Sequence, residues 1–239
     1  MTVDFNSLNF KNIVDNIKEI CYNVSVAKEK YRKSDDLVEI MAVTKTVAPE
    51  IVNIAVNEGI TLLGENRVQE FLSKKDFYDI RAEVQFIGHL QTNKVKYIIN
   101  EVSLIQSVDS LKLAQEINRL ALKNNKVMDI LVEINIGGES TKSGIDKLQV
   151  IDLVENISQL ENVKIKGLMT IPPPMCSENV FDEMHGIFLD LKDRKISNVN
   201  MDILSMGMSS DYETAIKHGS NLVRIGTKLF GARNYMEVT

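Results

Sequence analysis

The chain has 239 residues, of which 44% are hydrophobic and 26% are charged, so its composition is that of an ordinary globular protein. Its net charge is -5 with both signs interspersed, and it lacks the basic footprint that is typical of nucleic-acid-binding proteins. No apolar run approaches the roughly 20 residues of a membrane span, and no basic segment followed by an apolar one marks a secretory signal.

Cysteine and histidine positions argue against a metal site. Cys21 and Cys176 are far apart and outside any C-x-x-C pair, which disfavours a disulfide framework and a thiolate zinc site. His89, His185 and His218 have no H-x-x-x-H or H-E-x-x-H spacing. We therefore expect a cytoplasmic protein without a metal, a nucleic-acid partner or a membrane partner.

The chain opens on a predicted amphipathic helix, roughly residues 6–33, in which apolar residues recur at helical spacing. After it, short apolar runs alternate with seven helical patterns. The runs that predict strands are 37–43, 60–65, 83–88, 102–108, 129–136, 164–171, 201–207 and 221–226.

This alternation predicts an α/β fold, a single (β/α)8 TIM barrel domain over residues 1–239 with an added N-terminal helix. An alternating chain implies a parallel sheet, and eight repeats in about 200 residues fit a barrel. A doubly wound open sheet is the alternative, which the count of eight and the lack of a G-x-G-x-x-G turn after the first strand disfavour. The N-terminal helix could cover the barrel bottom within one chain, so we expect a monomer.

The loops after the last two predicted strands are candidates for a phosphate site. In such barrels function lies at the C-terminal ends of the strands, and phosphates often bind after strands seven and eight. Glycine permits close backbone approach, and a helix opening at Ser209 and Ser210, with Glu213 at capping-box spacing, would offer free amides to an anion. Each residue alone is more simply a turn or a cap, but together they favour a phosphate site. The residues are Met206, Gly207, Ser209, Ser210, Gly226 and Thr227.

Lys45 lies just past the first predicted strand, in the segment MAVTKTVAPE. A lysine amine is a nucleophile toward aldehydes once burial and nearby positive charge lower its pKa from about 10.4. Taken alone, such a lysine is more simply one that extends its charged head into solvent. Opposite a phosphate site it suits an aldehyde phosphate, and pyridoxal 5'-phosphate (PLP) is the obvious candidate.

Arg224 is flanked by apolar residues in VRIG, so its side chain could point into the barrel. Beside a PLP ring, the guanidinium could donate a hydrogen bond to the pyridine nitrogen and disfavour its protonation. The ring would then be a weaker electron sink. The alternative is an internal ion pair with Glu65 or Glu133.

Seven sequence blocks resemble those of the PLP homeostasis family, the PLP-binding proteins of the YggS/PROSC type. The barrel of that family is similar to the N-terminal domain of alanine racemase and of eukaryotic ornithine decarboxylase. The blocks cover nearly the whole chain, and they are AVTKTVAPE, LLGENRVQE, FIGHLQTNKVKYI, IQSVDS, VEINIGGESTKSGI, GLMTIPP and LSMGMSSDYETAIKHGSNLVRIGTKLFGAR.

The resemblance implies a position for the cofactor. Lys45 would form an internal aldimine, a covalent Schiff base, with PLP, and Arg224 would face the pyridine nitrogen. Asn66 and His89 would line the surroundings of the cofactor. Ser209, Gly226 and Thr227 would hold the phosphate, and the 206–210 loop would shape the pocket.

The resemblance also implies a role. Members of the family bind PLP, limit the free reactive aldehyde, and influence vitamin B6 and amino-acid pools, and the family has no established turnover. We therefore expect a PLP homeostasis protein that is not an enzyme, with PLP-dependent apoenzymes as candidate partners.

The first alternative is a PLP-dependent amino-acid racemase of low activity. Two-base racemization needs a second acid/base group on the opposite face of the substrate. In relatives of this fold type that group is a tyrosine from a C-terminal β domain of the partner subunit, whereas this sequence stops at Thr239, just after the eighth predicted strand.

The second alternative is a nucleotide-binding protein. The segment GGESTKSG resembles a P-loop, but a true P-loop has glycine directly before its lysine, and here Thr141 precedes Lys142. The segment also lacks the required helix start. Lys142 is more simply a solvated loop lysine on the functional rim.

Overall fold

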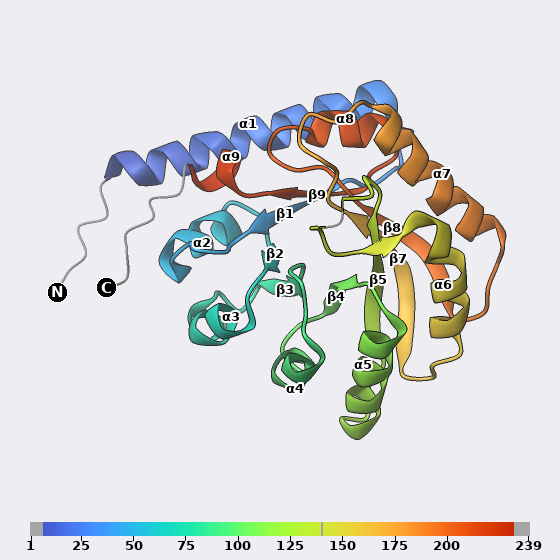
Figure 1. Ribbon diagram of the computed structural model, residues 1–239. Helices are drawn as coiled ribbons and strands as arrows, with labels where there is room; N and C mark the ends of the chain where they lie inside the picture. The colour runs from blue at the N-terminus through green and yellow to red at the C-terminus, as the bar shows by residue number, and fades with distance from the viewer. Residues whose placement is uncertain (1–6, 140, 232–239) are drawn as a thin grey trace.

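Eight parallel strands close into a barrel in the computed structural model, which describes residues 7–139 and 141–231 (Figure 1). The strands follow one another in the order β1, β2, β3, β4, β5, β7, β8 and β9, and β9 pairs with β1 to close the ring. The predicted (β/α)8 barrel is therefore confirmed. The bounds are β1 Glu39–Val43, β2 Leu62–Glu65, β3 Glu83–Phe86, β4 Leu104–Val108, β5 Met128–Asn135, β7 Val163–Thr170, β8 Val199–Ser205 and β9 Leu222–Ile225.

A ninth strand in the described part of the chain, β6 (Ile145–Asp146), pairs with the C-terminal end of β5 and is not part of the ring. Ile134 pairs with Ile145 in parallel register. The sequence pattern predicts no strand here, because two residues are too few to show an alternation.

Helices surround the barrel (Figure 1). Local signals fix both ends of α2: Pro49 lies in its first turn, and Gly59, with φ of 98°, follows its last turn. The bounds are α1 Ser7–Tyr31, α2 Pro49–Asn57, α3 Val68–Lys74, α4 Val95–Ile98, α5 Leu111–Lys123, α6 Val150–Ser158, α7 Asn179–Asp193, α8 Tyr212–Lys217 and α9 Thr227–Phe230, with 3-10 turns at Lys75–Phe77, Thr92–Lys94 and Lys147–Gln149.

The N-terminal helix α1 packs along the flank of the barrel, against α2, α8 and α9, and the expectation that it covers the bottom is wrong (Figure 1). Its buried residues Ile13 and Ile17 share one apolar cluster with Val223 and Ile225 of β9. Since α9 has only four residues, it leaves the outer face of β9 and β1 uncovered. Helix α1 fills this position of the eighth barrel helix.

Side chains alternate across the strands as the strand period of two requires. In β9, Val223 and Ile225 face the outer helices, whereas Leu222 packs with Met41 inside the barrel. Arg224 lies beside Met41 in the register of β9 and β1 and is buried. In β1, Met41 and Val43 face the barrel interior by the same alternation, and Lys45 continues this series at the C-terminal rim.

Among the described residues, we find no helix with the length and apolar character that crossing a membrane requires.

Candidate functional site

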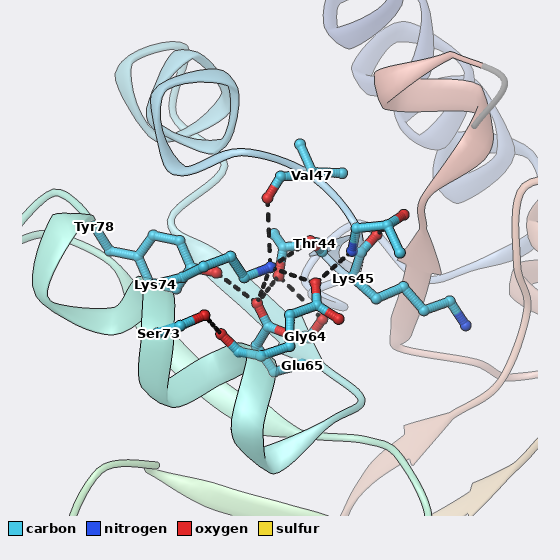
Figure 2. A network of polar contacts seen from close by, with 10 residues as sticks. Thr44, Lys45, Val47, Gly64, Glu65, Ser73, Lys74 and Tyr78 are labelled. Carbon is cyan, nitrogen blue, oxygen red and sulfur yellow. Dashed lines mark hydrogen bonds and ion pairs between the residues drawn. The ribbon is translucent and has the colours of Figure 1, made fainter. Parts of the chain in front are cut away.

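Lys45 lies two residues past β1, at the C-terminal rim of the barrel. It lines a small hollow together with Val43, Gly226 and Thr227. Its side chain extends toward the segment that carries β9 and α9, as Figure 2 shows. The structure thus brings Lys45 next to two of the residues predicted for a phosphate site, because β1 and β9 are neighbours in the ring.

The loops after β8 and β9 converge on one hydroxyl oxygen. Backbone N–H groups of Gly226 and Lys228 both donate to Ser209 Oγ, at 3.3 and 3.2 Å. Gly207 has φ of 95°, and a Cβ there would lie 2.5 Å from the Cβ of Ala215, so a glycine is required for this approach. Two amides that already point at one oxygen are suited to an oxygen of an anionic ligand.

The helix after β8 begins later than predicted. Helix α8 starts at Tyr212 with Asp211 as its N-cap, so the expected capping box of Ser210 and Glu213 is wrong. Ser210 is exposed and lies in a turn. Asp211 Oδ1 accepts from the backbone N–H of Met208 at 2.6 Å, and this turn delays the helix. The amides that point at Ser209 therefore come from Gly226 and from Lys228 in the first turn of α9, and not from α8.

Met206 contributes to this rim through its backbone. Its side chain is buried in the core between the barrel and the outer helices, in the cluster that also holds Leu204 and Ala215. Its carbonyl accepts from Ser220 Oγ at 2.7 Å. The residue shapes the loop that holds Gly207 and Ser209, and its side chain does not line the hollow of Lys45.

Arg224 is buried inside the barrel, as its sequence context predicts. Its Nη1 donates to Ser205 Oγ at 2.6 Å and its Nη2 donates to the carbonyl of Thr170 at 2.7 Å. Burial lowers the pKa of Arg224 to about 10, although the charges of Glu133 and Asp211 act in the opposite direction. The guanidinium is therefore still charged at neutral pH.

Neither carboxylate considered as an ion-pair partner of Arg224 forms such a pair in the described part of the chain. Glu65 lies 3.0 Å from Lys74 Nζ, on the outer side of the sheet. Glu133 Oε1 accepts from Ser143 Oγ at 2.8 Å. Burial is the main reason that the pKa of Glu133 is raised. The charge of Arg224 is therefore met at close range by neutral oxygens.

The hydrogen bonds of Arg224 continue across the barrel interior through residues that the sequence analysis missed. Ser205 Oγ donates to Gln106 Oε1 at 2.7 Å, and Gln106 Nε2 donates to Gln85 Oε1 at 2.7 Å. A signal for them exists in the sequence: each is an uncharged polar residue within a mainly apolar run, as in EVQFIG, VSLIQSV and MDILSMG.

Asn66 and His89 lie together on another part of the rim. Both line a hollow of about 500 Å³ between the loops after β2 and β3. Gly88 allows these loops to touch, because a Cβ there would lie 2.1 Å from the carbonyl oxygen of Asn66. Asn66 Oδ1 is buried and has no hydrogen-bond partner among the described residues. His89 Nδ1 is 3.8 Å from Asp109 Oδ2, a residue that sequence reasoning did not select.

A polar network lies behind the backbone of Lys45, between the barrel and α3 (Figure 2). Glu65 is its centre: Thr44 Oγ1 donates to Glu65 Oε1 at 2.7 Å, and the hydroxyl of Tyr78 donates to the same oxygen. Lys74 Nζ forms the ion pair with Glu65. Burial, and next the charge of Glu65, raise the pKa of Tyr78, so this hydroxyl remains a donor.

A larger hollow, about 640 Å³, lies away from this rim. The end of α1, α7 and the start of β8 form it, with Arg32, His185 and Asp202 among its lining residues. None of the predicted site residues lines it, so volume alone does not locate the chemistry.

The P-loop interpretation finds no support in the local structure. Lys142 pairs with Glu139, and its Nζ is 3.4 Å from the carbonyl oxygen of Pro172. The described residues after it form β6 and a 3-10 turn, whereas a P-loop leads directly into a helix. In the described ranges, no three His, Cys, Asp or Glu side chains come together in a way that could hold a metal ion.

The residues present fit a phosphorylated aldehyde. Lys45 supplies an amine beside Gly226 and Thr227, and Ser209 marks the point where two backbone amides converge. Arg224 supplies a buried cation on the interior side of β9. A lysine amine, a loop whose backbone amides could hold a phosphate, and a side chain beside the pyridine nitrogen, which is an aspartate or an arginine, are features of PLP sites.

Comparison with known proteins gives a consistent result. The family model for the alanine racemase N-terminal domain matches residues 16–234. The pyridoxal phosphate homeostasis protein of Aquifex aeolicus is 42% identical over 227 residues, which cover 94% of this chain and 100% of that protein.

Solved structures show the same fold. The crystal structure of an unknown protein from Bifidobacterium adolescentis has a TM-score of 0.89 at 30% identity, covering 95% of this chain and 97% of that one. PipY of Synechococcus elongatus PCC7942, solved with PLP bound, has a TM-score of 0.77 at 28% identity, covering 89% and 100%. The chain therefore belongs to the alanine racemase N-terminal domain family and, within it, to the pyridoxal phosphate homeostasis proteins.

Proposed function

We propose that this protein binds PLP at the C-terminal rim of the barrel, holds it as a Schiff base on Lys45, and thereby takes part in PLP homeostasis. The observation that carries the proposal is the shared hollow of Lys45, Gly226 and Thr227. It lies next to the Ser209 oxygen on which two backbone amides converge.

Each residue has a distinct role in this proposal. Lys45 Nζ adds to the aldehyde carbon and one water molecule leaves, so the bond forms without an oxidant or a reductant. Ser209, Gly226 and Thr227 hold the phosphate through a hydroxyl and backbone amides. Arg224 faces the pyridine nitrogen, where its charge disfavours protonation of the ring. When bound, PLP would supply an electron-withdrawing ring, and this ring is a weaker electron sink while its nitrogen stays unprotonated.

We further propose that binding, rather than turnover, is the task of the protein. The relative from Aquifex aeolicus carries the name of a homeostasis protein, and a cation beside the ring nitrogen disfavours carbanion chemistry. By limiting the free aldehyde, a cytoplasmic monomer of this kind would influence amino-acid pools and supply PLP-dependent apoenzymes. Racemization of alanine by the purified protein at about 1–1000 turnovers per second, the range typical of enzymes, would contradict this part.

The central experiment is to find the modified lysine. The purified protein is mixed with PLP, the imine absorption band is recorded, and the adduct is reduced with borohydride and mapped by peptide mass spectrometry. We expect the label at Lys45, and we expect Lys45→Ala to lose the band. Lys75→Ala, which changes a lysine of a 3-10 turn outside the rim, is the matched control and keeps it. A label on another lysine, or no band, contradicts the proposal.

A further inference from the structure

The backbone just after Lys45 is strained. Thr46 has φ of 63°, in the left-handed region, which a β-branched residue rarely adopts. Strain of this kind persists only where the surroundings impose it, and it is concentrated at functional sites. The contacts that impose it here therefore indicate what the fold is holding in place.

Helix α3 supplies one of these contacts through Glu70. Glu70 Oε1 accepts from the backbone N–H of Thr46 at 2.5 Å, and on the other side it accepts from Lys74 Nζ at 2.8 Å. Burial acts to raise the pKa of Glu70, but the hydrogen bonds from Lys74 and from the Thr46 amide outweigh it, and the pKa is lowered. Glu70 is therefore ionised at neutral pH and is a strong acceptor for this amide.

Lys74 supplies the second set of contacts. Its Nζ donates to the carbonyl oxygens of Thr44 at 2.9 Å and of Val47 at 3.4 Å. These carbonyls lie on either side of Lys45 in the chain. Lys74 also pairs with Glu65 of β2 at 3.0 Å and with Glu70 of its own helix, so both the sheet and α3 fix the position of its ammonium group.

All of these contacts reach the backbone of the 44–47 turn from the outer side of the barrel. The side chain of Lys45 extends in the opposite direction, as Figure 2 shows. The arrangement therefore leaves the hollow beside Gly226 and Thr227 open to Lys45 while fixing the Cα from which its side chain starts.

We propose that Glu70 and Lys74 are positioning residues that hold the strained turn and thereby aim Lys45 at the aldehyde of its ligand. The inference rests on the proposed function, since it assigns a purpose to Lys45. Each acts through the backbone of the turn: Glu70 through the amide of Thr46, and Lys74 through the carbonyls of Thr44 and Val47. Small displacements of a reacting group have large effects on bond formation, up to about 100-fold for 1 Å.

The test compares two ligands. PLP binds through its phosphate and also through its aldehyde, whereas pyridoxine 5'-phosphate carries an alcohol in place of the aldehyde and cannot bond to Lys45. A residue that aims Lys45 affects only the first ligand. A residue that merely maintains the fold of the rim affects both, so the ratio of the two dissociation constants isolates the positioning role.

The variant to measure is Glu70→Ala, and Glu116→Ala is its matched control. Glu116 is also a helical carboxylate that accepts from a cation of its own helix, Arg119, and it lies far from Lys45 in the α5 helix. We expect Glu70→Ala to weaken PLP about tenfold and to slow imine formation, with pyridoxine 5'-phosphate unchanged within about twofold. Glu116→Ala should leave both ligands unchanged.

Two further variants distinguish the hydrogen bond from the charge. Glu70→Gln keeps an oxygen that can accept from the Thr46 amide, so it should restore most of the PLP affinity. Glu70→Asp keeps the charge for Lys74 but shortens the reach to Thr46, so it should weaken PLP about fivefold. Glu70→Asp also carries the test if Glu70→Ala fails to fold.

The outcomes separate this inference from the proposed function. If wild-type protein forms no imine at Lys45, the proposed function is wrong. If wild-type protein forms it and the folded Glu70 variants bind PLP like Glu116→Ala, the positioning role is overturned. A parallel loss of affinity for both ligands would also overturn it, because it would indicate a structural role alone.

Discussion

Two buried polar networks flank the rim strands, and they satisfy their cations in different ways. The outer network, Thr44, Glu65, Lys74 and Tyr78, places a carboxylate 3.0 Å from its cation. The inner network, Arg224, Ser205, Gln106 and Gln85, surrounds its cation with a hydroxyl and a carbonyl oxygen. The charge of Lys74 is balanced by a carboxylate in direct contact, whereas the charge of Arg224 is not balanced in this way and can act on a ligand.

The difference follows from what each network must do. Removing one partner of a buried ion pair strongly destabilises the fold, because the other charge then remains buried without an opposite charge beside it. Removing a cation that is bonded to neutral oxygens costs less folding free energy, because it leaves only unpaired hydrogen-bond acceptors and no unpaired charge. The outer network is thus suited to fixing backbone, and the inner network to setting the electrostatics of a ligand site.

The largest effect is expected for Lys74→Met. The substitution leaves Glu65, which is fully buried, without its cation. We expect the free energy of unfolding to fall by about 3–5 kcal/mol in urea denaturation. Lys75→Met, which removes the surface ion pairs with Asp76 and Glu101 at the neighbouring position, is the control and should leave the free energy of unfolding nearly unchanged.

A smaller loss is expected for Arg224→Met. It removes the donors to Ser205 and to the Thr170 carbonyl but leaves no carboxylate unpaired at hydrogen-bond distance. We expect a cost of about 1–3 kcal/mol in the same assay. A cost equal to that of Lys74→Met would remove the distinction between the two networks.

Ligand affinity, rather than stability, should respond to Ser209→Ala combined with Thr227→Ala. The double variant removes the oxygen on which the Gly226 and Lys228 amides converge. We expect PLP to bind about tenfold more weakly while the unfolding free energy changes by about 1 kcal/mol or less. Ser197→Ala, at an exposed position between α7 and β8, is the control; unchanged affinity in the double variant would place the phosphate elsewhere.

The smallest effect is expected for Thr46→Gly, which relaxes the turn held by the outer network. Glycine adopts φ of 63° without strain, although it adds entropy to the unfolded chain. We expect a net stabilisation of about 1 kcal/mol, measured by thermal unfolding. A net destabilisation would mean that the Thr46 side chain, whose Oγ1 lies 2.6 Å from the Lys45 carbonyl oxygen, contributes more than the strain removes.

The sequence predicts the barrel well because strands buried on both faces read as continuous apolar runs. The limits of the runs are less certain: Leu37 belongs to the first apolar run but is 77% exposed and precedes β1. Lys45, Gly226 and Thr227 could be grouped from the sequence because the strand ends of a barrel share one rim.

The hydrogen bonds between α3 and the 44–47 turn could not be predicted in this way. It depends on how far α3 is rotated and how closely Glu70 approaches the Thr46 amide, and helical periodicity gives neither quantity. Likewise, Ser210 and Asp211 are both good caps in sequence terms, and only the turn that forms around Met208 selects Asp211.

The position of α1 has a consequence for the order of folding. Asn16 Nδ2 of α1 donates to the carbonyl of Leu229 in α9, so this contact joins residues 213 positions apart in the chain. Such distant contacts form late, because the chain between them must first be ordered. We therefore expect the contacts of α1 with α8 and α9 to form only after β9 has joined β1, and the pocket of Lys45, which is built where β9 and β1 meet, to be completed at the same stage.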